Sequence, residues 1–187
     1  LFSAGGFGEE PISSAGNEIE QVIVSASRIS QPASEISSNI ARISGETLTT
    51  ISHTHINEAL QRVSGTWISR GNGQEHLTAI RSPVLTGAGG CGAFLMAQDG
   101  IPLRASGFCN VNELFDANSE QAGAIEVIKG PASALYGSNA MHGLINILTP
   151  DVEAEDRLSV GAEVGPHEYF RTKFTANYAG LRVDLNG

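Results

Sequence analysis

The stretch that decides the fold reads Ile125-Glu126-Val127-Ile128-Lys129-Gly130-Pro131-Ala132-Ser133-Ala134-Leu135-Tyr136-Gly137. Its first five residues are rich in β-branched side chains, which favours a strand, and the Gly130-Pro131 pair ends that strand. A second strand is predicted over 144–149, where Leu144-Ile145-Asn146-Ile147-Leu148-Thr149 runs up to Pro150. Strands this short, mixed with short helices, predict an α+β fold.

Further short elements are predicted upstream of this stretch. A helix is predicted over 56–63, because Ile56, Leu60 and Val63 share one face and Gly65 follows as a C-cap. The remaining elements expected are a helix over 44–48, strands over 19–26, 67–70, 78–81 and 94–97, a break at Gln31-Pro32 and a turn at Asp99-Gly100.

After Pro150 apolar and polar side chains alternate. Apolar residues fall at every second position of three successive segments, 158–165, 170–178 and 181–186. A period of two over segments of about ten residues is typical of outer-membrane barrel strands, and the alternative is an ordinary half-buried antiparallel sheet. Because a barrel needs about eight strands or more, the barrel interpretation makes the chain the front part of a larger protein. The absence of a methionine at Leu1 is interpreted as a mature or truncated form.

The composition excludes several classes of protein. With 11 basic and 20 acidic residues the net charge is −9 and no basic patch appears, so nucleic acid is not an expected partner. No apolar run approaches about 18 residues, so no transmembrane helix is predicted. The hydrophobic content of 41% is too high for a disordered acidic segment and allows a real core.

The candidate chemical motifs are weak. The run Gly87-Ala88-Gly89-Gly90-Cys91-Gly92 matches the letters of a dinucleotide fingerprint, but 94–99 is too short for the helix that must follow, so a Gly-rich loop is favoured. His53-Thr54-His55 lacks an evident third ligand nearby, so solvated helix-start residues are favoured over a metal site. No nucleophile elbow, His-Glu-x-x-His or Cys-x-x-Cys motif occurs, so neither an enzyme nor a cofactor is predicted.

The run 125–140 and its continuation 141–149 resemble the plug domain of TonB-dependent outer-membrane receptors, above all in Gly-Pro-x-x-x-Leu-Tyr-Gly. Three upstream stretches fall in the family's order, namely Ala59–Gly65, Ile80-Arg81 and Asp99–Pro102. The departures are local: Ser82-Pro83 stands where the family usually has Gly, Ala97-Gln98 precede Asp99, and Pro150 replaces the common Lys after Thr149.

The resemblance implies an α+β fold: a plug domain with a small mixed β-sheet and short helices, followed by the first antiparallel strands of a truncated transmembrane β-barrel. The implied organisation is a flexible lead-in over 1–17, a TonB-box segment and linker over 18–30, the plug domain over 31–150 and the start of the barrel over 151–187.

The resemblance also implies roles for individual residues. The strand-competent segment on the flexible arm takes the place of the TonB box, which would add to a sheet edge of the periplasmic TonB protein. This segment consists of Ile19, Glu20, Gln21, Val22, Ile23, Val24 and Ser25. Contacts with the barrel wall are implied for Arg81, Glu126 and Lys129. Loops 71–76 and 84–110 would face an external ligand, through Arg70, Asn72, Gln74, Thr86, Arg104 and Phe108.

The same resemblance implies a place and partners. The chain would lie in the outer membrane of a Gram-negative bacterium, with the plug in the barrel lumen and the box in the periplasm. In that oxidising context a Cys91–Cys109 disulfide is favoured over separate thiols or metal ligands. The implied partners are the TonB C-terminal domain, the chain's own barrel and a small ligand, in this family most often a siderophore-type iron chelate. The alternative is a free-standing periplasmic binding module with a plug fold and no barrel.

Overall fold

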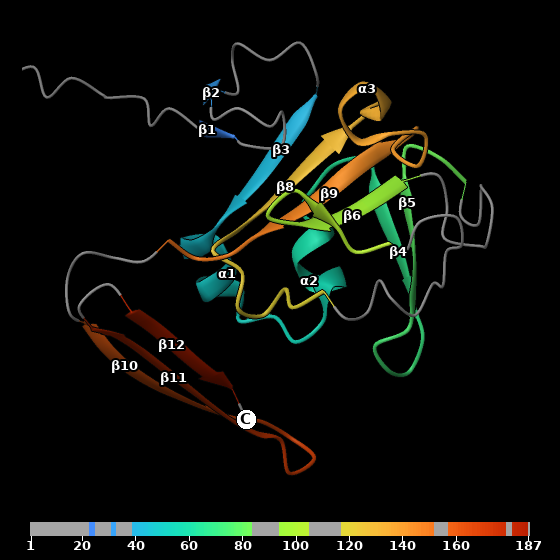
Figure 1. The fold of residues 1–187 in the computed structure, drawn as a ribbon. Helices are drawn as coiled ribbons and strands as arrows, with labels where there is room; N and C mark the ends of the chain where they lie inside the picture. The colour runs from blue at the N-terminus through green and yellow to red at the C-terminus, as the bar shows by residue number, and fades with distance from the viewer. Residues whose placement is uncertain are drawn as a thin grey trace, which may run out of the picture.

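The computed structural model describes residues 23–24, 31–32, 39–83, 94–104, 117–151, 157–178 and 181–186. Its centre is a five-stranded sheet in the order β3-β8-β9-β6-β7 (Figure 1). Strands β6 and β9 run parallel and the other neighbours run antiparallel, so the sheet is mixed, as the resemblance to the plug family implies. The strands are β3 (Ile40–Ser44), β6 (Phe94–Gln98), β7 (Ile101–Pro102), β8 (Ala124–Lys129) and β9 (Gly143–Leu148).

Both faces of this sheet are covered, which explains why all six residues of β8 are buried. One face carries Ile125, Val127, Ile145 and Ile147, packed with helices α1 (Gly45–Ile51) and α2 (Ile56–Leu60). The opposite face packs Ile128 and Leu144 against Tyr136 of the short helix α3 (Ser133–Tyr136). Apolar residues therefore occupy both faces of 125–128 and 144–148, and each run is interrupted by one buried polar residue, Glu126 or Asn146.

Helices α1 and α2 form where the sequence predicts them, but their boundaries differ from the predicted ones. Helix α1 begins at the N-cap Ser44, whose Oγ accepts from the Thr47 N–H at 3.2 Å. Helix α2 ends at Leu60, shorter than the predicted 56–63, and its C-cap is Gln61. The predicted capping role of Gly65 is therefore wrong: Gly65 has a φ of +83° in the turn that enters the next strand.

Two hairpins flank the central sheet. Strands β4 (Thr66–Arg70) and β5 (His76–Ile80) pair antiparallel, and the predicted strand over 78–81 stops at Ile80 because Arg81 has a φ of +49°. Strands β1 (Ile23–Val24) and β2 (Gln31–Pro32) also pair antiparallel, so Gln31-Pro32 is a short strand and not only a break. Most of the strand expected over 19–26 lies outside the described residues. Strands β2, β3 and β7 and helix α3 are elements that the sequence pattern did not separately predict.

The predicted Asp99-Gly100 turn joins β6 to β7. Both residues have positive φ, 49° and 77°, the backbone of a type I′ hairpin turn. The turn is tied to β9 and its end: Gly100 N donates to Asn146 Oδ1 at 2.8 Å, and the Asp99 carboxylate accepts from the Thr149 N–H at 2.8 Å.

A separate antiparallel sheet follows Pro150 (Figure 1). It consists of β10 (Arg157–Val164), β11 (Phe170–Tyr178) and β12 (Leu181–Asn186), in the order of the sequence. The three strands coincide with the three alternating segments, so the period of two correctly predicted them. Among the described residues, no helix is long and apolar enough to cross a membrane.

We predict that Gly143→Ala lowers the free energy of unfolding by about 1–3 kcal/mol, because an added Cβ would lie 2.3 Å from the Ile128 carbonyl oxygen. Gly71→Ala is the matched control, since its Cβ would lie at an ordinary 3.6 Å from the Glu75 oxygen. Urea unfolding of the two detergent-refolded variants measures the difference. Equal midpoints would contradict the close approach of β9 and β8.

Candidate functional site

The two faces of the β10–β12 sheet differ in chemistry. One face is apolar and exposed, with large side chains from all three strands: Leu158, Val160, Val164, Phe170, Phe174, Tyr178, Val183 and Leu185. The other face is polar and turns toward the central sheet, with Ser159, Glu163, Arg171, Lys173, Thr175 and Asp184. Register keeps the faces separate, since Glu163 lies opposite Arg171 and Val160 lies opposite Phe174.

Arg171 joins this polar face to the central domain. Its guanidinium is nearly buried, with 7% of the side chain exposed, and donates to carbonyls at the end of α1. Nη1 lies 3.0 Å from the Ser52 oxygen, and both Nη1 and Nη2 lie 3.3 Å from the His53 oxygen. Nη2 also pairs with Glu120 Oε2 at 2.7 Å. A buried cation needs such partners, so the position of Arg171 fixes the α1 end and the segment near Glu120 against β11.

Ser52 presents its carbonyl because α1 ends in a left-handed cap. Its φ and ψ are 52° and 41°, and its N–H closes the helix on Leu48 O at 2.9 Å. Its hydroxyl also bonds Glu163 and Lys173, which themselves pair at 3.2 Å. Two cations of β11 therefore meet the carbonyl end of α1, where the helix dipole favours positive charge.

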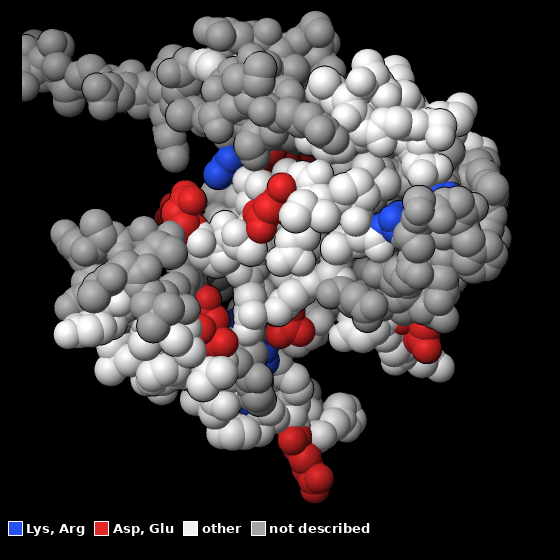
Figure 2. All heavy atoms as spheres, in the orientation of Figure 1, with Lys and Arg blue, Asp and Glu red and all other residues white. Residues whose placement is uncertain are grey.

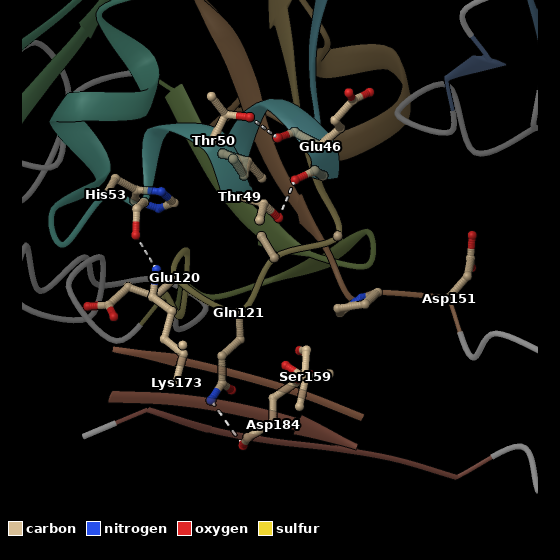
Figure 3. Close-up of a pocket in the computed structure, with 18 of the residues that line it drawn as sticks. Glu46, Thr49, Thr50, His53, Glu120, Gln121, Asp151, Ser159, Lys173 and Asp184 are labelled. Carbon is tan, nitrogen blue, oxygen red and sulfur yellow. Dashed lines mark hydrogen bonds between the residues drawn. The ribbon is translucent and has the colours of Figure 1, made fainter. Parts of the chain in front are cut away.

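A cavity of about 720 Å³ opens beside this junction, between α1 and the polar face (Figure 3). Gln121 Nε2 donates across it to the Asp184 carbonyl at 3.3 Å. Charged and polar side chains line it, among them Glu46, Thr49, Asp151, Ser159, Lys173 and Asp184. Figure 2 shows mostly acidic charges on the face in view, and the described basic residues there form no broad patch. The cavity between the two sheets is thus hydrophilic, and carboxylates outnumber cationic side chains in its lining.

The three residues expected to contact a barrel wall lie elsewhere. Glu126 is fully buried in β8, and its Oε1 pairs with Nη1 of Arg42, its cross-strand neighbour, at 2.8 Å. Lys129 Nζ lies 3.4 Å from Ser64 Oγ, and Arg81 Nη1 lies 3.4 Å from the Lys129 carbonyl. These contacts all join residues of the plug to one another. Their contact with further wall strands stays a prediction.

The other predicted residues are only partly described. Arg70 pairs with Glu58 Oε1 at 3.3 Å, and Asn72 and Gln74 are exposed in the β4–β5 turn. Arg104 follows β7 and is half-buried. Of the TonB-box residues only Ile23 and Val24 are described. Four predicted residues, namely Thr86, Phe108, Cys91 and Cys109, lie outside the described ranges, so the disulfide stays a prediction.

The histidines correct one expectation. His53 and His55 are 2% and 1% exposed, so their interpretation as solvated helix-start residues is wrong. His53 Nε2 lies 3.2 Å from Ser119 Oγ, next to the Glu120 that holds Arg171. Burial is the main cause that lowers the pKa of His53 below its ordinary value, which favours the neutral ring. In the described part of the chain, no three His, Cys, Asp or Glu residues are arranged to hold a metal ion.

The sequence analysis missed Arg171, Ser52 and Glu120. A signal existed for Arg171, which falls on the polar side of an alternating strand, opposite Glu163. No local pattern points to Ser52 or Glu120, because both act through the tertiary packing of loops that follow helix α1 and precede β8.

Comparison with known proteins now identifies the family. Residues 32–144 match the TonB-dependent Receptor Plug Domain family. The match covers more than half of the chain, and the described fold agrees with it, so the chain belongs to this family and carries its plug domain.

The relatives are much longer proteins. The chain is 28% identical over 169 residues to the vitamin B12 transporter BtuB of Vibrio vulnificus, covering 90% of this chain and 26% of that protein. It thus spans about a quarter of the length of that curated relative.

Solved outer-membrane receptors share the fold. The pyoverdine receptor FpvA of Pseudomonas aeruginosa matches with a TM-score of 0.64 and 17% identity, over 82% of this chain and 21% of that one. The ferric yersiniabactin uptake receptor FyuA of Yersinia pestis matches with a TM-score of 0.59 and 20% identity, over 74% of this chain and 21% of that one. The aligned part includes the plug fold and the start of the barrel strands.

We predict that Arg171→Met loosens the junction by about 2 kcal/mol and leaves the central sheet intact. Amide exchange at residues 51–54 and in β11 should then accelerate about thirtyfold, while β8 and β9 stay protected. Lys173→Met is the matched control, because Lys173 is more exposed and should change exchange less than about fivefold. Unchanged exchange in Arg171→Met would contradict its role at the junction.

Proposed function

We propose that the chain is the plug, with the first barrel strands, of a receptor that imports a scarce ligand across the outer membrane. The observation that carries this proposal is the two-faced β10–β12 sheet: its polar face holds the plug and its apolar face is left exposed. Alternation of this kind suits a strand with lipid on one side and a polar lumen on the other. The plug then acts as the gate of the lumen, and the proposal assigns it no catalytic step.

The proposed ligand is a siderophore-type iron chelate. It is supported by the likeness to the solved receptors for pyoverdine and ferric yersiniabactin. A cobalamin is the second candidate, because the curated relative at 28% identity is named a vitamin B12 transporter. Arg70, Asn72, Gln74, Thr86, Arg104 and Phe108 are the proposed ligand-facing residues.

The proposed orientation puts the TonB box in the periplasm and the β4–β5 turn outside. In Figure 1 the β4–β5 and β10–β11 turns lie at the lower end of the molecule, whereas β1 and β2 lie at the upper end. The turn predicted to face the ligand and the segment predicted to bind TonB are therefore at opposite ends. The outer membrane of a Gram-negative bacterium is the proposed location.

A free-standing periplasmic module is less well supported. In such a module the apolar faces of the last strands would pack on the plug to complete its core. They point away from it instead: Val164 is 81% exposed and Tyr178 is 70% exposed. Contiguous apolar surface of this extent needs a partner, which a surrounding lipid layer supplies.

The proposed coupling to TonB uses backbone hydrogen bonds of residues 19–25. A strand added to a sheet edge gains affinity from its N–H and C=O groups, so removing one N–H should break the addition. Val22→Pro should weaken binding to the purified TonB C-terminal domain at least tenfold without unfolding the plug, because proline cannot donate.

Val22→Ala is the matched control, since it keeps the N–H and should bind TonB nearly as well as the unsubstituted chain. Fluorescence anisotropy with labelled TonB domain measures both affinities. Unaltered binding of Val22→Pro would remove the box from this segment.

A further inference from the structure

One carbonyl in the β4–β5 turn accepts hydrogen bonds from two histidines. The Gln74 oxygen lies 2.9 Å from His76 Nδ1 and 3.3 Å from His55 Nε2. Because a carbonyl oxygen can only accept, both ring nitrogens must carry a proton in this arrangement. The two rings meet edge to face, with centroids 5.2 Å apart. The turn, which Gly71 N closes on Glu75 O at 3.0 Å, is thus held by side chains from outside it.

The second nitrogen of His55 fixes its protonation state. His55 is the N-cap of α2, and its Nδ1 accepts from the Asn57 N–H at 3.0 Å. Nδ1 must therefore be unprotonated, and His55 is the neutral ring with its proton on Nε2. A further proton can bind only at Nδ1, where it would face the Asn57 N–H and end the cap.

The charged groups around His55 do not compensate for the hydrogen bond that is lost when Nδ1 is protonated. Arg70 of β4 and His53 oppose a charge on His55, and Glu58 of α2 favours one. The Glu58 carboxylate is already engaged, since Oε1 pairs with Arg70 at 3.3 Å and Oε2 accepts from Thr54 N at 3.0 Å. His76 faces His55, so charging one ring opposes charging the other.

We propose that His55 is a proton-sensitive clasp that holds the β4–β5 turn, residues 71–75, to the start of α2. The neutral ring closes the clasp by capping α2 and donating to Gln74. Protonation in acid breaks the cap, adds a charge beside Arg70 and releases the turn. The clasp depends only on these contacts, and its use in controlling ligand access rests on the proposed function.

The direction of the pH dependence follows from burial. Burial is the largest cause that lowers the pKa of His55 and of His76 below the ordinary value of 6.5. In the open state the rings are solvated and regain that value, so the open state binds more protons. Opening is therefore unfavourable above about pH 6.5 and becomes steadily easier as the pH falls through the lowered pKa of the closed state.

Hydrogen exchange of the full chain in detergent, at pH 7.5 and pH 5.0, tests the clasp. After correction for intrinsic rates, the amides of 71–75 and of Asn57 should exchange at least tenfold faster at pH 5.0, while those of β8 should not change. The single tryptophan, Trp67 on β4, gives a second signal through its fluorescence.

Two variants separate His55 from other titrating groups. Asn caps helices well and does not titrate, so His55→Asn should keep α2 and reduce the pH-induced acceleration to the smaller part that His76 contributes. His167→Asn, in the β10–β11 turn, should keep the full acceleration. The same pH-induced acceleration in His55→Asn, or equal exchange of the unsubstituted chain at both pH values, would overturn the proposal.

If the His55→Asn variant fails to fold, a measurement on the unsubstituted chain still tests the clasp. The ¹⁵N signals of the His55 ring should show one protonated and one bare nitrogen at pH 7.5, and should change over the pH range in which the turn opens. A ring that stays neutral while the turn opens would equally overturn the clasp. Neither result bears on TonB binding, so failure of the clasp is distinguishable from failure of the proposed function.

Discussion

The buried guanidinium of Arg171 is the interaction on which the arrangement of the two sheets depends. A cation with 7% of its side chain exposed is tolerated only where acceptors surround it, and here these are the Ser52 and His53 carbonyls and the Glu120 carboxylate. The acceptors come from two segments far apart in the sequence, so one side chain brings both segments to β11. This contact also sets the position of α1 and hence one wall of the cavity beside it. The cation lies on strand β11 and the carboxylate lies on the segment of the plug that precedes β8.

The apolar core of the plug includes no described residue of β10–β12. Both hydrophobic clusters lie on the two faces of the central sheet and draw only on residues between Ile40 and Ile147. The described contacts that cross to β10–β12 are ion pairs and hydrogen bonds, from Arg171, Lys173, Glu163 and the Asp184 carbonyl. Polar contacts exchange with water at small net cost, whereas apolar contacts do not. A plug held by such contacts can shift against the β10–β12 sheet without losing its own apolar core.

Local signals predicted much of the fold and little of the site. The β-branched run 125–129, the Asp99-Gly100 turn and the alternation after Pro150 each act over a few residues, so the sequence alone places β8, the β6–β7 turn and β10–β12. Edge strand β3 was not predicted, because the charged Arg42 at its centre interrupts the apolar pattern. The structure accommodates Arg42 there because Glu126 of the next strand pairs with it. The sequence predicted His53 and His55 to be solvated because polar side chains are usually exposed. In the structure both rings are buried and form hydrogen bonds there, with Ser119, Gln74 and Asn57. Ser52 and Glu120 become partners of Arg171 only through tertiary packing, which no sequence spacing reveals.

The most direct test of the account is the native size and location of the protein in its own cells. An antibody against residues 1–150 would be used on fractionated membranes, with samples run before and after boiling. The account predicts an outer-membrane band several times larger than 19.6 kDa that shifts on heating, as closed barrels do. A periplasmic band near 19.6 kDa, unchanged by heating, would contradict it and leave a binding module without a wall.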